Sequence, residues 1–142
     1  MKTLRLDIEY EYDFDLYGLV SPGKEYTVAW WLNKLFKLHL KKQQDLCYLF
    51  GSNEKLLISN YEFSTEHSTV RLFRNKALGT NTFKKPFLLP EIKEYDYVLQ
   101  VTGTFSNLYP QELIGKIHNI PLVQYVKQFD PLTLKFKENL IF

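Results

Sequence analysis

This sequence has almost no cysteine. It also has no long apolar run, no strong charge bias and no familiar catalytic motif. The 142 residues include one cysteine, Cys47, so no internal disulfide can form and no thiol pair can bind zinc. Eighteen Lys and Arg against sixteen Asp and Glu give a net charge of +2, too small to direct the whole molecule to nucleic acid or to an anionic membrane. No segment approaches the ~20 apolar residues that span a bilayer, and Met1 to Tyr12 lack the apolar stretch of a signal peptide. We therefore expect a protein of the reducing cytoplasm that has no membrane segment.

Aromatic residues, in contrast, are abundant. The chain has 11 Phe, 10 Tyr and 2 Trp, or 16% of all residues. Each buried ring removes about 150–250 Å² from water, and a chain of this length is close to the commonest domain size. We therefore predict one domain, residues 1–142, with a substantial core.

The clearest pattern is the alternation of apolar and charged residues from Leu4 to Leu16. Because neighbouring side chains of a strand point to opposite faces, it predicts a long strand with one buried face and one acidic face. A helix is expected over about Glu25 to Lys37, entered through Ser21 as a cap and Pro22 in the first turn. Asn33 interrupts the apolar side of this helix and needs a hydrogen-bond partner if it is buried.

Further along the chain, short apolar runs separated by turn residues predict antiparallel strands. The predicted strands and helix are Leu46–Phe50, Leu56–Phe63, Thr69–Phe73, Tyr95–Thr104, the short helix Pro110–His118, and Val123–Phe129, followed by an extended tail from Leu132 to Phe142. Between them, residues 75–90 are expected to form a long loop. A strand, a short helix and a strand form a crossover unit with parallel strands. The sequence thus predicts an α+β fold of two layers, a mostly antiparallel sheet of about six strands with two helices packed on one face. The predicted order of elements is β-α-β-β-β-β-α-β, and the C-terminal half is expected to form a ferredoxin-like βαβ unit.

Residue types that carry chemistry are present but not grouped as an active site requires. Five carboxylates share one face of the first predicted strand, at Asp7, Glu9, Glu11, Asp13 and Asp15. A straight strand spaces them about 6.6 Å apart, which suits a solvated face better than a calcium site or a basic partner protein. His39, His67 and His118 are scattered, and Cys47 is expected to be a buried, inert thiol. We expect no metal and no cofactor, because phosphate-loop, nucleophile-elbow and dinucleotide fingerprints are missing.

One segment mixes cations with aromatic rings, as single-stranded nucleic-acid grooves do. Its members are Arg71, Phe73, Arg74, Lys76, Phe83, Lys84, Lys85 and Phe87. The simpler interpretation is an ordinary basic surface with Phe residues in the core, so RNA binding through residues 71–87 is the alternative function.

Residues 89–97, Leu-Pro-Glu-Ile-Lys-Glu-Tyr-Asp-Tyr, resemble the motif of the bacterial IPExxVDY family. Segments 13–19, 26–33, 44–46 and 138–142 also read like that family, whereas Leu89, Tyr95 and a three-residue spacing after Glu91 depart from the motif. The resemblance implies a bacterial source and no particular activity, cofactor or substrate. Pro90 is expected to start a strand, and Glu91 and Asp96 to cap local backbone or to pair with Lys93 or the basic loop.

These observations favour a non-catalytic binding or adaptor protein that acts through exposed aromatics and the basic loop. Its partner is expected to be a protein, with a homodimer as one form of this, and an enzyme of unknown chemistry is the second alternative. The candidate binding residues are Arg71, Arg74, Lys84, Lys85, Pro90, Glu91, Asp96 and Tyr97.

Overall fold

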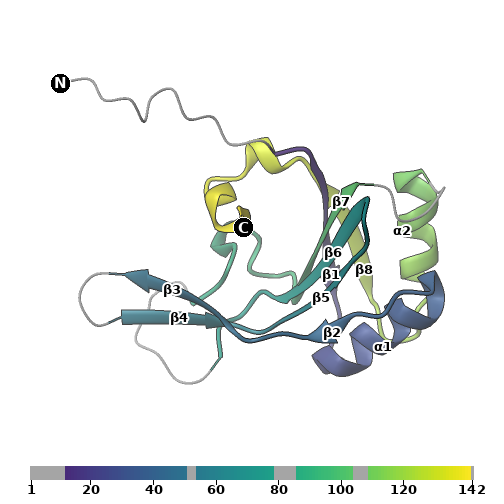
Figure 1. Cartoon of the computed structure of the whole chain (residues 1–142), viewed down its shortest axis with the longest axis horizontal. Helices are drawn as coiled ribbons and strands as arrows, with labels where there is room; N and C mark the ends of the chain where they lie inside the picture. Colours follow the sequence, from purple (N-terminus) through teal and green to yellow (C-terminus); the bar gives the residue numbers. More distant parts are fainter. Residues whose placement is uncertain (1–11, 51–53, 79–85, 104–108, 142) are drawn as a thin grey trace.

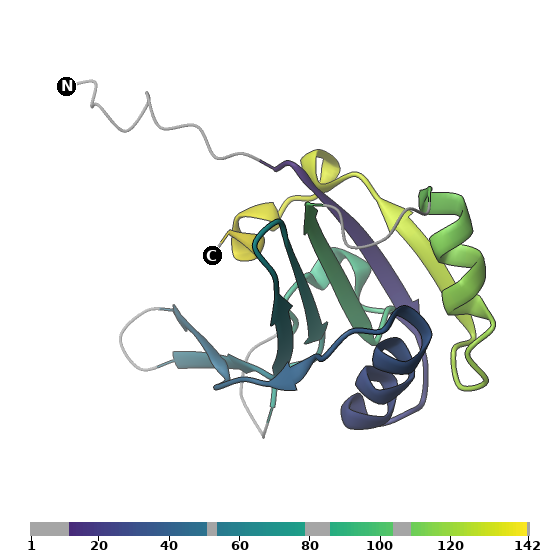
Figure 2. The same cartoon turned by 45° about the vertical axis from the view of Figure 1, so that its right-hand side comes forward.

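The computed structural model describes residues 12–50, 54–78, 86–103 and 109–141. Within them, six strands form one sheet in the order β2-β5-β6-β7-β1-β8, with every neighbouring pair antiparallel (Figure 1). These strands are β1 Phe14–Val20, β2 Lys41–Lys42, β5 Asn60–Ser64, β6 Ser68–Arg74, β7 Tyr97–Gly103 and β8 Tyr125–Phe129. Two helices, α1 Glu25–Phe36 and α2 Pro110–His118, pack into one apolar cluster on one face of the sheet (Figure 2). The predicted α+β fold, with its antiparallel sheet and two helices, is confirmed.

The C-terminal half has the predicted crossover. Both β7 and β8 are antiparallel to β1, which lies between them, so β7 and β8 run parallel to each other and α2 connects them. Helix α2 begins at Pro110, whose missing N–H costs nothing in a first turn, and it ends before Pro121, as predicted.

Strand β1 confirms the predicted alternation where the structure describes it. The stretch from Leu4 to Glu11 lies outside the described residues, but Phe14 and Leu16 are buried while Asp15 is exposed. Beyond Leu16 the alternation ends, because Tyr17, Gly18 and Leu19 are all buried. A strand with no exposed side must be covered on both faces.

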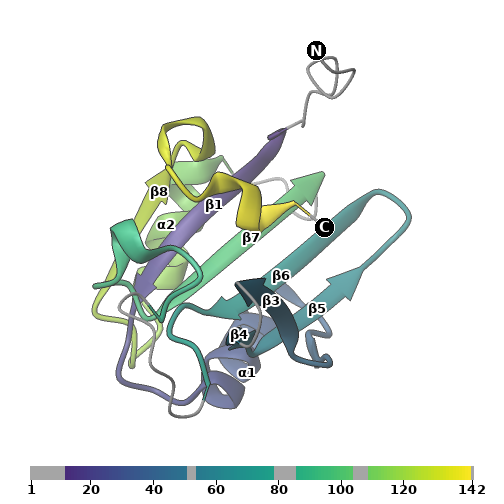
Figure 3. The same ribbon diagram turned by 90° about the vertical axis from the view of Figure 1, so that its left-hand side faces the viewer.

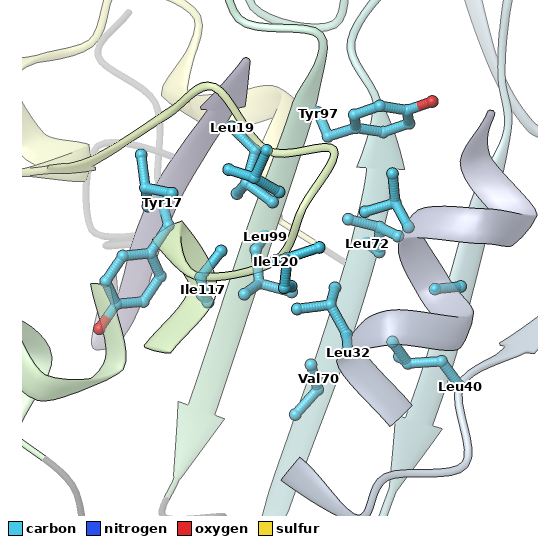
Figure 4. Close-up of a cluster of buried hydrophobic side chains, with 14 of the residues drawn as sticks. Tyr17, Leu19, Leu32, Leu40, Val70, Leu72, Tyr97, Leu99, Ile117 and Ile120 are labelled. Carbon is cyan, nitrogen blue, oxygen red and sulfur yellow. The ribbon is translucent and has the colours of Figure 1, made fainter. Parts of the chain in front are cut away.

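The first face carries the helices. Leu19 of β1, Leu72 of β6 and Leu99 of β7 point toward Leu32 of α1 and Ile117 of α2 (Figure 4). We call this apolar group the helix-side core. Asn33, on α1, has the partner that it needs: its side chain accepts from Leu40 N at 2.8 Å and donates to Leu40 O at 3.3 Å.

The opposite face is covered by segments without long helices (Figure 3). Leu16 of β1, Phe73 of β6 and Val98 of β7 belong to a second buried cluster together with residues of a hairpin, of the segment before β7 and of the C-terminal tail. Those covering residues are Leu56, Ile58, Leu88, Leu89, Ile92, Leu134 and Leu140. We call this group the tail-side core.

The hairpin corrects the predicted meander. The run expected as one strand over Leu56–Phe63 breaks at Ser59 into β4 Glu54–Ile58 and β5 Asn60–Ser64. Strand β4 pairs with β3 Leu46–Phe50 in a separate two-stranded sheet, and β5 joins the main sheet. Buried Asn60 holds the corner, because its side chain donates to Gln44 O at 3.0 Å.

Two further predictions of extended backbone are wrong. Pro90 does not start a strand but begins a 3₁₀ helix, Pro90–Ile92, and the tail forms two more, Pro131–Thr133 and Lys137–Leu140. Short 3₁₀ turns of this kind are frequent in connecting segments. The Asp130 side chain starts the second one by accepting from Leu132 N at 3.0 Å.

The entry to α1 also differs from its prediction. Ser21 does not cap the helix, which begins four residues later at Glu25, and Pro22 is not in its first turn. Instead, Ser21 Oγ accepts from Gly23 N and donates to Leu122 O, so it holds the loop between β1 and α1 against the loop before β8. In the part of the chain that the structure describes, no helix has the length and apolar character needed to cross a membrane.

Candidate functional site

The described residues of the predicted basic and aromatic segment do not all share one surface, although Arg74, Lys76 and Phe87 line one pocket. Arg71 and Arg74 lie three residues apart on β6, and alternation places their side chains on opposite faces of the sheet. Arg71 is bound to Glu62 at 2.8 Å and to Gln100 at 3.5 Å, while Phe73 is buried in the tail-side core. Lys84 and Lys85, with Phe83, lie outside the described residues. Arg71, Phe73 and Arg74 therefore do not form one exposed patch, and buried Phe73 agrees with the simpler interpretation, in which the Phe residues of this segment belong to the core.

The structure also shows where the predicted thiol and the acidic strand face lie. Cys47 is exposed on β3, which corrects the expected buried thiol, because the side chains of this two-stranded sheet are covered on one side only. Of the acidic strand face, Asp13 and Asp15 are described and exposed, while Asp7, Glu9 and Glu11 fall outside the described residues. Among the described residues, no group of three or more His, Cys, Asp or Glu side chains is placed to hold a metal ion.

The residues of the 89–97 motif bind the backbone of distant segments. The Glu91 carboxylate accepts from Phe136 N at 3.1 Å and also from Lys135 N, in the C-terminal tail. Asp96 Oδ2 accepts from Ser21 N at 2.8 Å, and the Tyr97 hydroxyl donates to Gly23 O. Glu91 and Asp96 were expected to cap local backbone or to pair with nearby cations, and the backbone that they cap is remote in sequence.

Asp96 and Tyr97 together fix the β1–α1 loop across one end of the sheet and so form a pocket. Its volume is about 300 Å³, and it is lined by residues of the loop, of the end of β6, and of the segment before β7. An adjoining hollow of about 390 Å³ shares Gly23, Arg74 and Tyr97 with it and adds Glu25 and Tyr26. We call the two together the Arg74 pocket. Of the predicted binding residues, the structure brings Arg74, Asp96 and Tyr97 together here.

The electrostatics of the Arg74 pocket are unbalanced. Its lining holds four cations, Lys24, Arg74, Lys76 and Lys93, against the carboxylates of Glu25 and Asp96. Asp96 is engaged by Ser21 N. The Arg74 side chain has no hydrogen bond or ion pair with any described residue, in contrast to Arg71. The pocket therefore offers unused positive charge.

Tyr97 in this pocket is a hydrogen-bond donor rather than a base. Burial, and secondly the charge of Glu25, raises the pKa of Tyr97 to about 12. Its hydroxyl is consequently protonated at neutral pH, and it donates to Gly23 O. Tyr97 therefore acts as a structural contact between the pocket wall and the β1–α1 loop.

The outer face of α1 borders this pocket and carries exposed rings. Tyr26, which lines the pocket, is 59% exposed, and Trp30, one turn further along, is 53% exposed. Lys34 Nζ lies 5.1 Å from the centroid of the Trp30 ring and 5.6 Å from that of Trp31. We call Tyr26, Trp30 and Lys34 the α1 surface.

The sequence did not point to the α1 surface, although a signal for it existed. Trp30 lies three residues after Thr27 and four before Lys34. These spacings place it on the same helical stripe as those two polar residues. A residue on the polar stripe of a helix is expected to face solvent, whatever its type.

Comparison of the chain with protein-family models, with curated proteins and with solved structures found no match. The Arg74 pocket and the α1 surface are therefore interpreted from their geometry.

Proposed function

We propose that this protein is a non-catalytic binding module of the bacterial cytoplasm that recognises a partner protein through the α1 surface. The observation that carries the proposal is the exposure of Tyr26 and Trp30 on adjacent turns of one helix. Trp and Tyr dominate the energetics of protein interfaces because they bury a large area with few rotatable bonds. Lys34, stacked near both Trp rings, adds a cation to the same surface.

The structural roles of the neighbouring residues support binding over catalysis. Asp96 accepts from Ser21 N and Tyr97 donates to Gly23 O, so both side chains are engaged in holding the β1–α1 loop. Such a frame keeps the first turn of α1, and with it Tyr26, in one position. A preorganised surface loses less entropy when a partner binds.

RNA binding through residues 71–87 receives less support from the geometry. Arg71 and Arg74 lie on opposite faces, and Phe73 is buried, so these three cannot line one groove for a strand. The resemblance to the IPExxVDY family stays a prediction. The backbone contacts of Glu91, Asp96 and Tyr97 support a structural role for the motif.

The proposal is tested by comparative capture on the immobilised protein from an extract of the cells that make it. We expect a protein that binds the wild type and is lost with the double variant Tyr26→Ala/Trp30→Ala. Tyr125→Ala/Leu132→Ala is the matched control, because these side chains are also exposed but lie on β8 and in the tail. Ribonuclease treatment of the extract should leave the capture unchanged.

A direct readout is available because both Trp residues lie on α1. Adding the captured partner should protect Trp30 from acrylamide quenching. Capture that is equal for the double variant and the control, or that disappears after ribonuclease, would contradict the proposal.

A further inference from the structure

Two groups with opposite requirements border the Arg74 pocket, the half-buried Arg74 guanidinium and Glu25 Oε2, and neither has a hydrogen-bond partner among the described residues. The Arg74 guanidinium offers up to five N–H donors and has no hydrogen bond or ion pair with any described residue. Glu25 Oε2 is buried and has no hydrogen-bond partner in the described part of the chain. A buried polar atom that is left unpaired is uncommon in folded proteins, so Glu25 Oε2 requires an explanation.

The two groups do not pair with each other. They line the same hollow of about 390 Å³, yet Arg74 and Glu25 form no ion pair. Tyr97, which lies between the two parts of the pocket, cannot bridge them because its hydroxyl donates to Gly23 O. A bound species that accepts from Arg74 and donates to Glu25 meets both requirements at once.

The rest of the lining sets the charge of that species. Lys76 and Lys93 border the adjoining hollow with Arg74, and the carboxylate there, Asp96, is already engaged by Ser21 N. An oxyanion is therefore favoured beside Arg74, whose planar guanidinium binds two oxygens at once. The adjoining volume of about 300 Å³ equals the share of roughly 10 water molecules in the liquid, enough for a small ion with some of its hydration water.

We propose that the Arg74 pocket binds a small oxyanion that carries its own hydrogen-bond donor, of which hydrogen phosphate is the simplest. Arg74 holds the anionic oxygens with Lys76 and Lys93 nearby, and the hydroxyl of the ion donates to Glu25 Oε2. A hydroxycarboxylate has the same chemistry, since its carboxylate accepts and its hydroxyl donates. Sulfate and acetate have anionic oxygens for Arg74 but no hydrogen-bond donor for Glu25 at neutral pH. They therefore satisfy only one of the two groups.

This site is separate from the proposed partner binding and does not depend on it. The α1 surface shares Tyr26 with the lining of the pocket, but Trp30 and Lys34 are not part of that lining. Loss of Trp30 should therefore impair partner capture and leave anion binding unchanged. The two proposals can fail independently.

The first experiment uses the full-length wild-type protein and four anions. Proton–nitrogen NMR spectra are recorded during titration with sodium phosphate, sulfate, glycolate and acetate at constant ionic strength and neutral pH. We expect saturable shifts of the Gly23 and Glu25 amides and of the Arg74 Nε–H signal with phosphate or glycolate. Sulfate and acetate should bind at least about tenfold more weakly than their donor-bearing counterparts, since one charge-assisted hydrogen bond is missing. The phosphate and glycolate titrations show which of the two sources the site prefers.

The second experiment uses two variants and a matched control. Arg74→Gln should weaken phosphate binding about tenfold or more, whereas Arg71→Gln should not, because Arg71 lies on the same strand but on the other face and is bound to Glu62. Glu25→Gln should bring phosphate and sulfate to within about twofold of each other, because an amide can donate to sulfate. If Arg74→Gln fails to fold, Arg74→Lys keeps the charge and loses the two-oxygen geometry, and it should also bind phosphate less tightly.

The proposal is overturned by shifts that do not saturate, by shifts that are equal for all four anions, or by equal effects of Arg71→Gln and Arg74→Gln. The comparison of phosphate with sulfate on the wild type requires no variant, so the result does not depend on the folding of any mutant.

Discussion

At the scale of single residues, buried polar side chains hold the irregular segments of this protein by binding backbone groups. Asn75 is 0% exposed, and its amide donates to Ile92 O at 3.1 Å and to Tyr95 O at 3.0 Å, while its oxygen accepts from Leu89 N at 2.8 Å. Tyr97 does the same for the β1–α1 loop through Gly23 O. Each such contact satisfies a backbone group that neither a helix nor a sheet satisfies.

The buried hydroxyl of Tyr97 should make stability depend on alkaline pH. Its pKa is about 12 in the folded chain, against an ordinary value of 10.0 that applies when the chain is unfolded. Between these values the unfolded chain loses the proton and the folded chain keeps it, so the free energy of unfolding falls as pH rises from about 10 to about 12. The full contribution, on the order of 2 kcal/mol, is present below about pH 10. Tyr97→Phe should reduce this pH dependence, and at neutral pH should cost about 1 kcal/mol for the lost hydrogen bond.

Urea denaturation at pH 9 and pH 11 measures this change, and tyrosinate absorbance counts the late-titrating groups. Tyr125→Phe, in which the lost hydroxyl belongs to an exposed residue, is the control. If the free energy of unfolding falls by the same amount from pH 9 to pH 11 in the wild type and in Tyr97→Phe, the pH dependence does not come from Tyr97. The burial of Tyr17 and Tyr48, which also raises each pKa to about 12, should leave part of the dependence in the variant.

At the scale of elements, Glu91 holds the C-terminal tail against one face of the sheet. Leu134 and Leu140 bury their side chains in the tail-side core, while the Glu91 carboxylate binds Lys135 N and Phe136 N between them. Tyr48 of β3 and Gln100 of β7 add hydrogen bonds to Asn139 O and Leu140 O. The tail is therefore attached both by apolar contacts and by specific backbone contacts.

Replacing Glu91 should loosen the tail without unfolding the sheet. Glu91→Ala leaves two N–H groups without their acceptor, so hydrogen exchange at residues 135 and 136 should become faster, by a factor equivalent to about 1–3 kcal/mol. Glu91→Gln keeps one acceptor oxygen and should lie between the wild type and Glu91→Ala. Glu94→Ala, at an exposed position nearby, is the control. Unchanged exchange in the tail of Glu91→Ala would show that the apolar contacts alone hold it.

At the scale of the whole molecule, the helix-side core and the tail-side core share the strands that separate them. Strand β7 contributes Leu99 to the first and Val98 to the second, and β1 contributes Leu19 and Leu16 in the same way. Removing one covering layer exposes the apolar side of the same strands to water. The two cores should therefore unfold together, as small cooperative domains do.

A cavity in the tail-side core should accordingly lower the stability of α1, which lies on the other side of the sheet. Leu88→Ala, at a fully buried position, should lower the free energy of unfolding by about 2–5 kcal/mol. Because both Trp residues lie on α1, their fluorescence reports the helix side. The midpoints from Trp fluorescence and from far-UV circular dichroism should shift equally, as they should for Leu32→Ala on the helix side. Leu132→Ala, at an exposed position, should change neither, and a Trp midpoint that stays fixed in Leu88→Ala would show that the two cores unfold separately.

Some features of the Arg74 pocket could be predicted from the sequence. If the strand predicted over residues 69–73 continues to Arg74, alternation places the side chains of Arg71 and Arg74 on opposite faces. The prediction of one basic segment grouped the two residues by their charge alone. Arg74, Asp96 and Tyr97 are among the residues that the sequence predicts for binding, but their meeting at one pocket was not predictable. It requires the β1–α1 loop, which is 75 residues from Asp96 in sequence at Ser21 and reaches it only in the folded chain.

The sequence by itself determined the local elements: α1 and α2, the strands β1, β6, β7 and β8, and the crossover that makes β7 and β8 parallel. These follow from hydrophobic period and from proline placement, which act between residues close in sequence. Only the tertiary structure decided the break at Ser59, the covering of the second face by hairpin and tail, and the lack of a partner for the Arg74 side chain among the described residues. Each of these depends on which distant backbone or side chain lies opposite, and that is set by packing in three dimensions rather than by any pattern along the chain.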